Sequence, residues 1–152
     1  MAPTTSVLFV CLGNICRSPM AEGIFSQLVA DRGVADQFDV ESAGTASYHA
    51  GSRPDRRTLE VLERHGIHLE SRSRQVADID FDRFDYILAM DRDNLENLQH
   101  RCPSEHRHKL HMALSTTTGG DVPDPYYGGP QGFDHNYAQL TAALGAWLER
   151  MS

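Results

Sequence analysis

The sequence of 152 residues has few cysteines and no long apolar run. Its three cysteines, Cys11, Cys16 and Cys102, are too few and too unevenly spaced for a disulfide framework. No apolar run approaches the ~20 residues of a membrane-spanning helix. The amino-terminal MAPTTSV lacks the basic flank and apolar segment of a signal peptide. We therefore expect a cytoplasmic protein that does not associate with a membrane.

Basic residues are also scarce. There are 14 Lys and Arg against 21 Asp and Glu, which gives a formal net charge of −7. A general nucleic-acid binder presents a basic surface, so this balance argues against nucleic acid as a partner. It leaves room for a small anionic substrate, because backbone amides and one arginine can hold a phosphate in a local pocket.

Two common ligand-binding motifs are missing as well. There is no G-x-x-x-x-G-K-[ST] nucleotide loop. Cys11 and Cys16 do not have zinc-ribbon spacing, and no second Cys/His pair complements them. His106, His108 and His111 cluster in a polar stretch, which favours a surface role over metal binding. We expect no metal and no cofactor.

What the sequence does contain is an alternation of apolar runs and helical patterns. The expected strands are 7–10, 38–44, 85–90 and, more weakly, 109–114. The expected helices run from Pro19 to Gly33 with Ser18 as cap, over 54–65 with Gly66 as a left-handed stop, from Asp91 and Asn94 onward, and from about Phe133 to Met151. This order predicts a single α/β domain over 1–152, with a parallel sheet between helices and the ligand at the carboxyl ends of the strands.

The stretch 11-CLGNICR-17 follows the first of these strands and precedes the first helix. Gly13 and Asn14 tolerate left-handed backbone angles, so the loop can curl with its N–H groups inward. The helix amino terminus adds further N–H groups and its dipole, which together make an anion nest. Arg17 can close the nest with a planar fork for two phosphate oxygens. Cys11 at the bottom would be held as a thiolate, a nucleophile aimed at phosphorus.

Other residues can support this chemistry. Ser18 can donate a hydrogen bond to the thiolate, and the Asn14 side chain can brace the loop from within. A bare C-x5-R pattern is weak, since inert buried cysteines and glycine turns are common. Its position between a buried strand and a Ser-Pro helix start makes it specific.

A proton donor for the leaving group is expected in 122-VPDPYYGG-129. Asp124 lies between two prolines, and Tyr126 and Tyr127 beside it can wall a slot for a planar leaving group. The alternative is an ordinary Asp-Pro turn, and these residues alone leave both readings open. We expect 44–53 and 115–132 to be loops.

CLGNICRSPMAE near the amino terminus, combined with DPYYGG, resembles the low-molecular-weight protein tyrosine phosphatase family. So do 41-ESAGT-45, 65-HGI-67, 74-RQV-76 and 89-AMDRDNL-95. The resemblance implies a flavodoxin-like, three-layer fold with a four-stranded parallel sheet. It also implies hydrolysis of phosphotyrosine in two steps. Cys11 forms a phosphocysteine while Asp124 protonates the tyrosine oxygen, and Asp124 then activates water. Arginine, amides and helix dipole supply the positive charge that a metal would bring.

The resemblance assigns further roles. The phosphate-binding loop comprises Leu12, Gly13, Asn14, Ile15, Cys16 and Ser18 together with Arg17, and the pocket wall comprises Tyr48, Tyr126 and Tyr127. Cys16 is implied to form a reversible disulfide with Cys11 under peroxide. Ile15 fits the tyrosine-phosphatase form, because similar proteins that act on phosphoarginine carry threonine there. Ser71 departs from the family, many members of which have a histidine that supports the loop serine and asparagine.

Two other functions fit the same loop. Some arsenate reductases share this fold, but they relay a disulfide through further cysteines, and only Cys102 remains here. A phosphotyrosine-binding module without turnover is the other alternative, yet Cys11, Arg17 and Asp124 are all present. Within the family we expect a phosphotyrosine protein as substrate, such as an autophosphorylating tyrosine kinase, and a monomer or weak dimer. His49 and 115-STTTGG-120 suggest no role.

Overall fold

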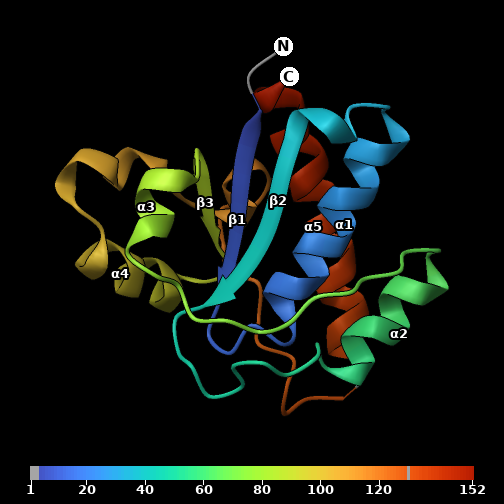
Figure 1. The fold of residues 1–152 in the computed structure, drawn as a ribbon. Helices are drawn as coiled ribbons and strands as arrows, with labels where there is room; N and C mark the ends of the chain where they lie inside the picture. The colour runs from blue at the N-terminus through green and yellow to red at the C-terminus, as the bar shows by residue number, and fades with distance from the viewer. Residues whose placement is uncertain (1–3, 130) are drawn as a thin grey trace.

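A parallel sheet forms the centre of the protein. The computed structural model describes residues 4–129 and 131–152 (Figure 1). In this part of the chain the sheet has four strands in the order β2-β1-β3-β4, and every neighbouring pair is parallel. The strands are β1 (Thr5–Cys11), β2 (Phe38–Gly44), β3 (Tyr86–Ala89) and β4 (Leu110–Met112). The predicted four-stranded parallel sheet is confirmed, with β4 shorter than its predicted segment.

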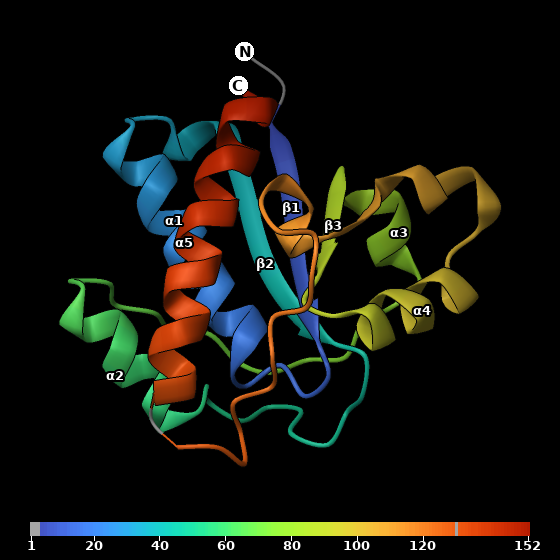
Figure 2. The ribbon, with the colours of Figure 1, turned by 180° about the vertical axis from the view of Figure 1, so that it is seen from behind.

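Helices cover both faces of this sheet, as predicted (Figures 1 and 2). On one face lie α1 (Arg17–Asp31) and α5 (Gln131–Met151), with α2 (Arg56–Arg64) beside them. On the other face lie α3 (Ile79–Arg83) and α4 (Arg92–Arg101). Short 3-10 turns span Ala35–Gln37, Ser104–Lys109 and Ala113–Thr116. In the described residues no helix has the length and apolar character needed to cross a bilayer.

The apolar run 7–10 in strand β1 is buried on both faces of the sheet. Val7 and Phe9 point into the core under α1 and α5, where the Phe9 ring meets Phe25 at a centroid distance of 5.7 Å. Leu8 and Val10 point into the second core under α3 and α4. A strand between two helical layers needs apolar side chains on both faces, which removes the usual alternation with polar residues.

The helix boundaries confirm some of the predictions and correct others. Gly33 and Gly66 have positive φ angles of 71° and 77° at the predicted ends of α1 and α2. The carboxylate of Asp91 accepts a hydrogen bond from the Asn94 N–H at 2.7 Å and caps α4 as expected. Helix α2 begins at Arg56 rather than at 54, with Asp55 as its cap.

Three predictions about local structure were wrong or incomplete. Ser18 does not cap α1: the helix already begins at Arg17, and the Ser18 hydroxyl is bound elsewhere. Gly13 is not left-handed, and Asn14 alone makes the turn in this loop, with φ of 56°. Helix α3, of five residues, was not predicted because one turn is too short to show a period. Its Phe81 is nonetheless fully buried in the second core.

Candidate active site

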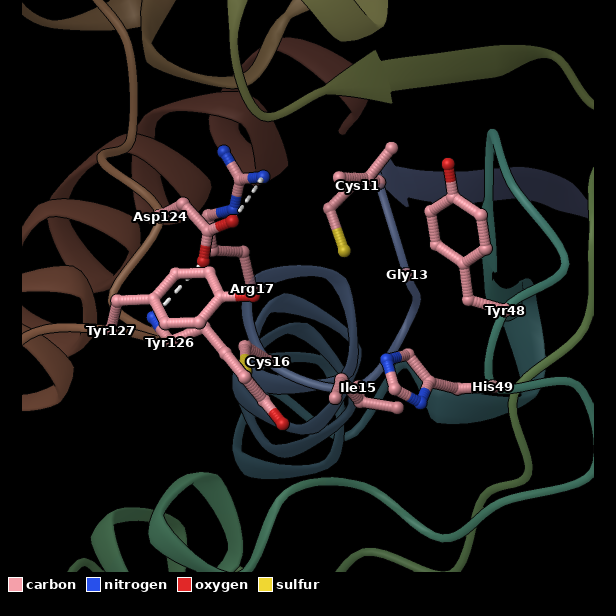
Figure 3. A pocket seen from close by; sticks show the side chains of 11 residues that line it. Cys11, Gly13, Ile15, Cys16, Arg17, Tyr48, His49, Asp124, Tyr126 and Tyr127 are labelled. Carbon is pink, nitrogen blue, oxygen red and sulfur yellow. Dashed lines mark hydrogen bonds and ion pairs between the residues drawn. The ribbon is translucent and has the colours of Figure 1, made fainter.

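A pocket of about 230 Å³ opens at the carboxyl end of β1, where open α/β sheets bind their ligands (Figure 3). Three segments far apart in the sequence form it. Its lining residues are Cys11, Leu12, Gly13, Ile15, Cys16, Arg17, Tyr48, His49, Asp124, Tyr126 and Tyr127. Thus the structure gathers nearly all the residues singled out in the sequence around one cavity. Asn14 and Ser18 are buried behind it.

The loop after β1 is held by its carbonyl groups. The N–H groups of Thr45 and Ala46 donate to the carbonyls of Cys11 and Leu12 at 2.9 and 3.0 Å. The Ser73 hydroxyl donates to the Gly13 carbonyl at 2.9 Å, and the Asp55 N–H donates to the Ile15 carbonyl at 2.7 Å. The Thr58 hydroxyl donates to the Cys16 carbonyl at 3.2 Å. This arrangement leaves the loop N–H groups as the donors for a bound anion.

Gly44, at the end of β2, allows this close packing. A Cβ atom at Gly44 would lie 2.7 Å from the Leu12 carbonyl oxygen, a distance that no side chain tolerates. The limit at Gly13 is weaker, because a Cβ atom there would lie 3.0 Å from Cδ2 of the His49 side chain, which could shift slightly. The glycine in 41-ESAGT-45 therefore allows the end of β2 to pack against the loop after β1.

The Cys11 thiol is buried at the bottom of the pocket, and its Sγ lies 3.0 Å from the Ser18 hydroxyl. The Asn14 amide donates to the Ser18 oxygen at 2.8 Å, so the hydroxyl hydrogen of Ser18 is free to point elsewhere. Its nearest acceptor is Cys11 Sγ, because the Ala43 carbonyl is farther away at 3.4 Å. Ser18 is thus placed to stabilise a thiolate at Cys11.

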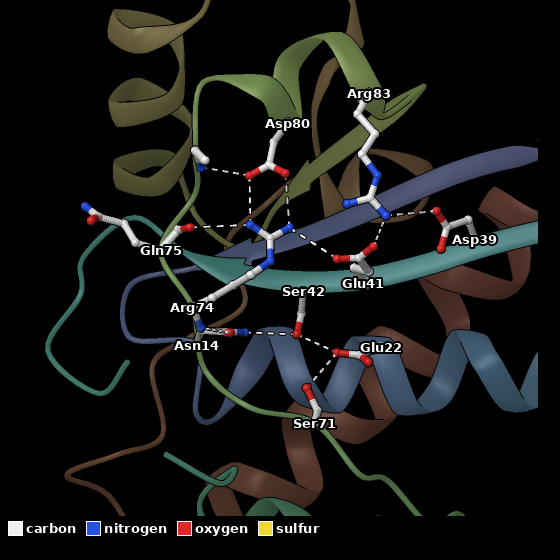
Figure 4. A network of polar contacts seen from close by, with 11 residues as sticks. Asn14, Glu22, Asp39, Glu41, Ser42, Ser71, Arg74, Gln75, Asp80 and Arg83 are labelled. Carbon is white, nitrogen blue, oxygen red and sulfur yellow. Dashed lines mark hydrogen bonds and ion pairs between the residues drawn. The ribbon is translucent and has the colours of Figure 1, made fainter. Parts of the chain in front are cut away.

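A polar network braces the loop from behind (Figure 4). The Asn14 amide also donates to the Ser42 hydroxyl at 3.0 Å. The hydroxyl groups of Ser42 and Ser71 both donate to Oε1 of Glu22, at 2.5 and 3.2 Å. Burial raises the pKa of Glu22, although these two hydrogen bonds act in the opposite direction. Ser71 therefore takes part in bracing the loop through Glu22.

Arg17 is buried and anchored by one of its two terminal nitrogens. Nη1 donates to the Asp91 carboxylate at 2.6 Å and to the Val122 carbonyl at 2.9 Å. Nη2 lies 3.9 Å from the Asp124 carboxylate. Burial acts to lower the pKa of Arg17, but the negative charges of Cys11 and Asp91 outweigh it and raise the pKa. The Nε–Nη2 edge is consequently the fork that can face a phosphate.

Asp91 is a site residue that the sequence reasoning missed. It was expected only to open a helix, and Oδ1 does cap α4. Its second oxygen, Oδ2, holds Arg17. Asp91 thus has a second role beside the predicted helix cap, through a partner 74 positions away in the sequence.

Asp124 and the aromatic residues form the rim. Oδ1 of Asp124 accepts the Tyr126 N–H at 3.1 Å. Figure 3 shows Asp124, Tyr126 and Tyr127 on one side of the cavity and Tyr48 and His49 on the other, with Cys11 and Arg17 between them. Tyr48 and Tyr127 are 76% and 94% exposed, so both rings are available to a partner that enters the pocket. His49 was given no role in the sequence, and its ring centroid lies 6.5 Å from that of Tyr126.

Comparisons with known proteins identify the family of this chain. The family model described as low molecular weight phosphotyrosine protein phosphatase matches residues 6–152. The Schizosaccharomyces pombe protein of that name is 47% identical over 144 residues, which cover 92% of each chain. The chain belongs to the low molecular weight phosphotyrosine protein phosphatase family.

Solved structures of this phosphatase family and its relatives show the same fold. A protein tyrosine phosphatase from Entamoeba histolytica, crystallised with Hepes in its active site, superposes with a TM-score of 0.94 at 39% identity and covers 97% of both chains. A Drosophila arginine phosphatase superposes with a TM-score of 0.89 at 35% identity over 96% of this chain and 97% of its own. The fold is therefore shared by proteins named for different phosphorylated residues.

The remaining cysteines of this phosphatase chain lie in unlike surroundings. Burial, together with the charge of Asp55, raises the pKa of Cys16 to about 12, so its thiol stays protonated at neutral pH. Cys102 packs in the second core with Leu8 and Val10, on the other side of the sheet from α1 and α5.

The histidine cluster has contacts of its own in the phosphatase fold. His106 pairs with Asp82, and His111 is half-buried against Trp147 at a ring distance of 5.1 Å rather than on the surface as expected. Among the described residues no group of three or more His, Cys, Asp or Glu could hold a metal ion.

Proposed function

We propose that this protein hydrolyses phosphotyrosine in proteins through a phosphocysteine intermediate. The observation that carries the proposal is the meeting of three groups at one pocket: the Cys11 thiol, the Arg17 guanidinium and the Asp124 carboxyl. Transfer of a phosphoryl group to a thiol requires these three groups: a nucleophile, an anion clamp and an acid.

In the first step Cys11 attacks as a thiolate. The S–P bond forms as the P–O bond to the tyrosine breaks, and the Asp124 carboxyl gives its proton to the departing phenolate oxygen. The Nε–Nη2 edge of Arg17 and the loop N–H groups bind the oxygens of the transferring group. Ser18, 3.0 Å from Cys11 Sγ, stabilises the thiolate before attack and again when it leaves.

In the second step Asp124, now a carboxylate, takes a proton from water. The water oxygen attacks phosphorus, the S–P bond breaks, and Cys11 returns to the thiolate as inorganic phosphate forms. The acid of the first step is regenerated by the second, so one carboxyl group serves both.

The rim supports a tyrosine side chain as the leaving group. Tyr126, Tyr48 and the apolar Ile15 line the pocket above Cys11 and suit a flat aromatic ring. The exposed Tyr127 and Leu12 extend the aromatic and apolar surface outward, where a protein substrate would lie.

A substrate panel in excess chelator tests the proposal. Phosphotyrosine should be hydrolysed, whereas phosphoserine, phosphoarginine and arsenate should be poor substrates. Arsenate reduction above phosphotyrosine hydrolysis would replace the proposed activity. The structure gives little support to that alternative, because Cys102 would have to leave the second core to relay a disulfide from Cys11 and Cys16.

We further propose that the substrate is an autophosphorylating tyrosine kinase in the cytoplasm and that the phosphatase acts as a monomer or weak dimer. The rim supports a protein substrate, since the side chains of Tyr48 and Tyr127 are exposed and can contact a polypeptide. Sedimentation over a range of concentrations measures the oligomeric state, and a stable higher oligomer would contradict this part.

A further inference from the structure

The start of α2 contacts both loops of the active site. The Asp55 N–H and the Thr58 hydroxyl bind carbonyls of the phosphate loop, as described above. Between them in sequence, Nη2 of Arg57 donates to the carbonyl of Tyr126 at 3.1 Å. A four-residue segment, 55–58, therefore joins the loop that binds phosphate to the loop that carries Asp124.

The Arg57 side chain is fixed from several directions. Its Nε and Nη2 both donate to the Asp55 carboxylate at 3.0 Å, in a bidentate pair. Its guanidinium carbon lies 4.5 Å from the ring centroid of Phe133 and 5.5 Å from that of Tyr126. A planar cation held by a carboxylate and two aromatic faces has little freedom to turn.

The neighbouring Arg56 offers a contrast within the same helix turn. Its side chain is 87% exposed and pairs only at the surface with Glu60, one turn along α2. Arg57 is 34% exposed and reaches across to another loop. The two arginines have the same chemistry but different partners, so Arg56 is a matched control.

The Tyr126 peptide links Arg57 to the acid. Tyr126 offers its carbonyl to Arg57, and it donates its N–H to Oδ1 of Asp124 at 3.1 Å. Holding residue 126 through its carbonyl, with the Arg57 guanidinium near its ring, limits how far the Asp124 side chain can drift from the pocket. Before Asp124, the 122–129 loop is tied by the Val122 carbonyl, which accepts from Arg17 Nη1 at 2.9 Å, and by the Asn136 amide, which donates to the Pro123 carbonyl at 3.1 Å. Arg57 holds the loop on the other side of Asp124, at residue 126.

We propose that Arg57 is a positioning residue for the general acid: through Tyr126 it holds Asp124 where it can protonate the leaving group. The inference rests on the proposed function. Arg57 does not touch the substrate in this account, and its whole effect passes through Asp124. Its loss should therefore weaken the proton transfer and leave the attack by Cys11 intact.

The dependence of rate on the leaving group separates this role from simple structural support. A good leaving group such as 4-nitrophenolate departs with little help from an acid, whereas the phenolates of phenyl phosphate and phosphotyrosine need the proton. With Arg57→Met we expect kcat/KM to fall less than about threefold for 4-nitrophenyl phosphate and about tenfold or more for phenyl phosphate. Arg56→Met should leave both values unchanged.

Each outcome of this experiment decides something. Equal losses on both substrates, or none on either, would overturn the role of Arg57. Wild-type protein that hydrolyses no aryl phosphate would overturn the proposed function itself, so the two failures are distinguishable. In an Asp124→Asn background, Arg57→Met should add no further dependence on the leaving group, and an added dependence would show that Arg57 acts by another route.

Thermal unfolding followed by circular dichroism checks that the variants fold. Should Arg57→Met fail to fold, Arg57→Lys keeps the charge but loses the planar fork. It should shift the dependence in the same direction by a smaller factor. A folded Arg57→Lys variant with the wild-type dependence would contradict the inference.

Discussion

The carboxylate of Asp91 and the guanidinium of Arg17 are joined by a hydrogen bond of 2.6 Å, and this bond sets which edge of Arg17 can meet a phosphate. Because Asp91 and the Val122 carbonyl occupy Nη1, the Nε–Nη2 edge is left to bind a phosphate. Asp91 also caps α4, so the clamp is held by a helix rather than by a mobile side chain.

Replacing Asp91 should therefore loosen the clamp. In Asp91→Asn the side-chain oxygen can still cap α4, but an amide cannot accept from Arg17 on its nitrogen side. We expect kcat/KM for phosphotyrosine to fall by roughly 10–100-fold and competitive inhibition by inorganic phosphate to weaken. Asp93→Asn, an exposed change in the same turn of α4, should behave as wild type. Unchanged phosphate affinity in Asp91→Asn would contradict this account of the clamp.

Asp124→Asn should slow phosphotyrosine hydrolysis by roughly 10²–10⁴-fold, because asparagine cannot give a proton to the leaving oxygen. The loss should be smaller for 4-nitrophenyl phosphate, whose leaving group needs little protonation. Steady-state kinetics on the two substrates measure the difference. An unchanged rate on phosphotyrosine would remove Asp124 from its role.

Oxidation should link the two cysteines of the pocket. The Cys16 thiol stays protonated at neutral pH, so peroxide should first convert the Cys11 thiolate to a sulfenic acid while peroxide is reduced. Attack by the Cys16 sulfur then forms the disulfide and releases water. Mass spectrometry should find a Cys11–Cys16 link, and thiol reductant should restore activity.

Cys16→Ser provides the control for this protection. Under the same peroxide it should lose activity that reductant does not restore, because Cys11 passes on to irreversible acids. Wild-type protein that accumulates a sulfonic acid at Cys11 without the link would contradict the protective role of Cys16.

Glu22 predicts a dependence of stability on pH. Burial raises the pKa of Glu22 in the folded protein above its value in the unfolded chain. Below the unfolded pKa, where Glu22 is neutral in both states, its full contribution to folding stability is present. That contribution is lost as pH rises through the folded pKa. Glutamine cannot ionise and keeps an oxygen for Ser42 and Ser71. The free energy of unfolding of Glu22→Gln, measured relative to that of wild type, should therefore increase as pH rises toward neutrality.

Urea unfolding across a pH series measures this difference. Glu96→Gln, an exposed change on α4, should show no such trend. If the stability of Glu22→Gln relative to wild type decreases as pH rises, the ionised carboxylate is stabilised in the fold, contrary to the expectation.

Much of the fold could be predicted because its signals are local. The continuous apolar run of β1 follows from burial between two helical layers, and Gly66 lies two residues after the last residue of α2. Ser18 shows where a local rule fails. A serine before a proline is a good cap, but its hydroxyl is taken by Asn14 and faces Cys11 instead.

The parts of the site that were missed depend on partners distant in sequence. Asp91 meets Arg17 across 74 residues, and Arg57 meets Tyr126 across 69. Their sequence contexts show only a helix cap and a charged helix start. No local pattern reveals which arginine of the pair 56–57 turns inward, because that choice is made by the tertiary packing of Phe133 and Tyr126 against it.

The most direct measurement is covalent trapping of the intermediate. Wild-type protein mixed with a phosphotyrosine peptide in excess chelator, quenched during turnover and analysed by mass spectrometry, should carry a phosphoryl group on Cys11. Cys11→Ser should show neither this group nor turnover. Equal turnover by wild type and Cys11→Ser, or a phosphoryl group on another residue, would contradict the account.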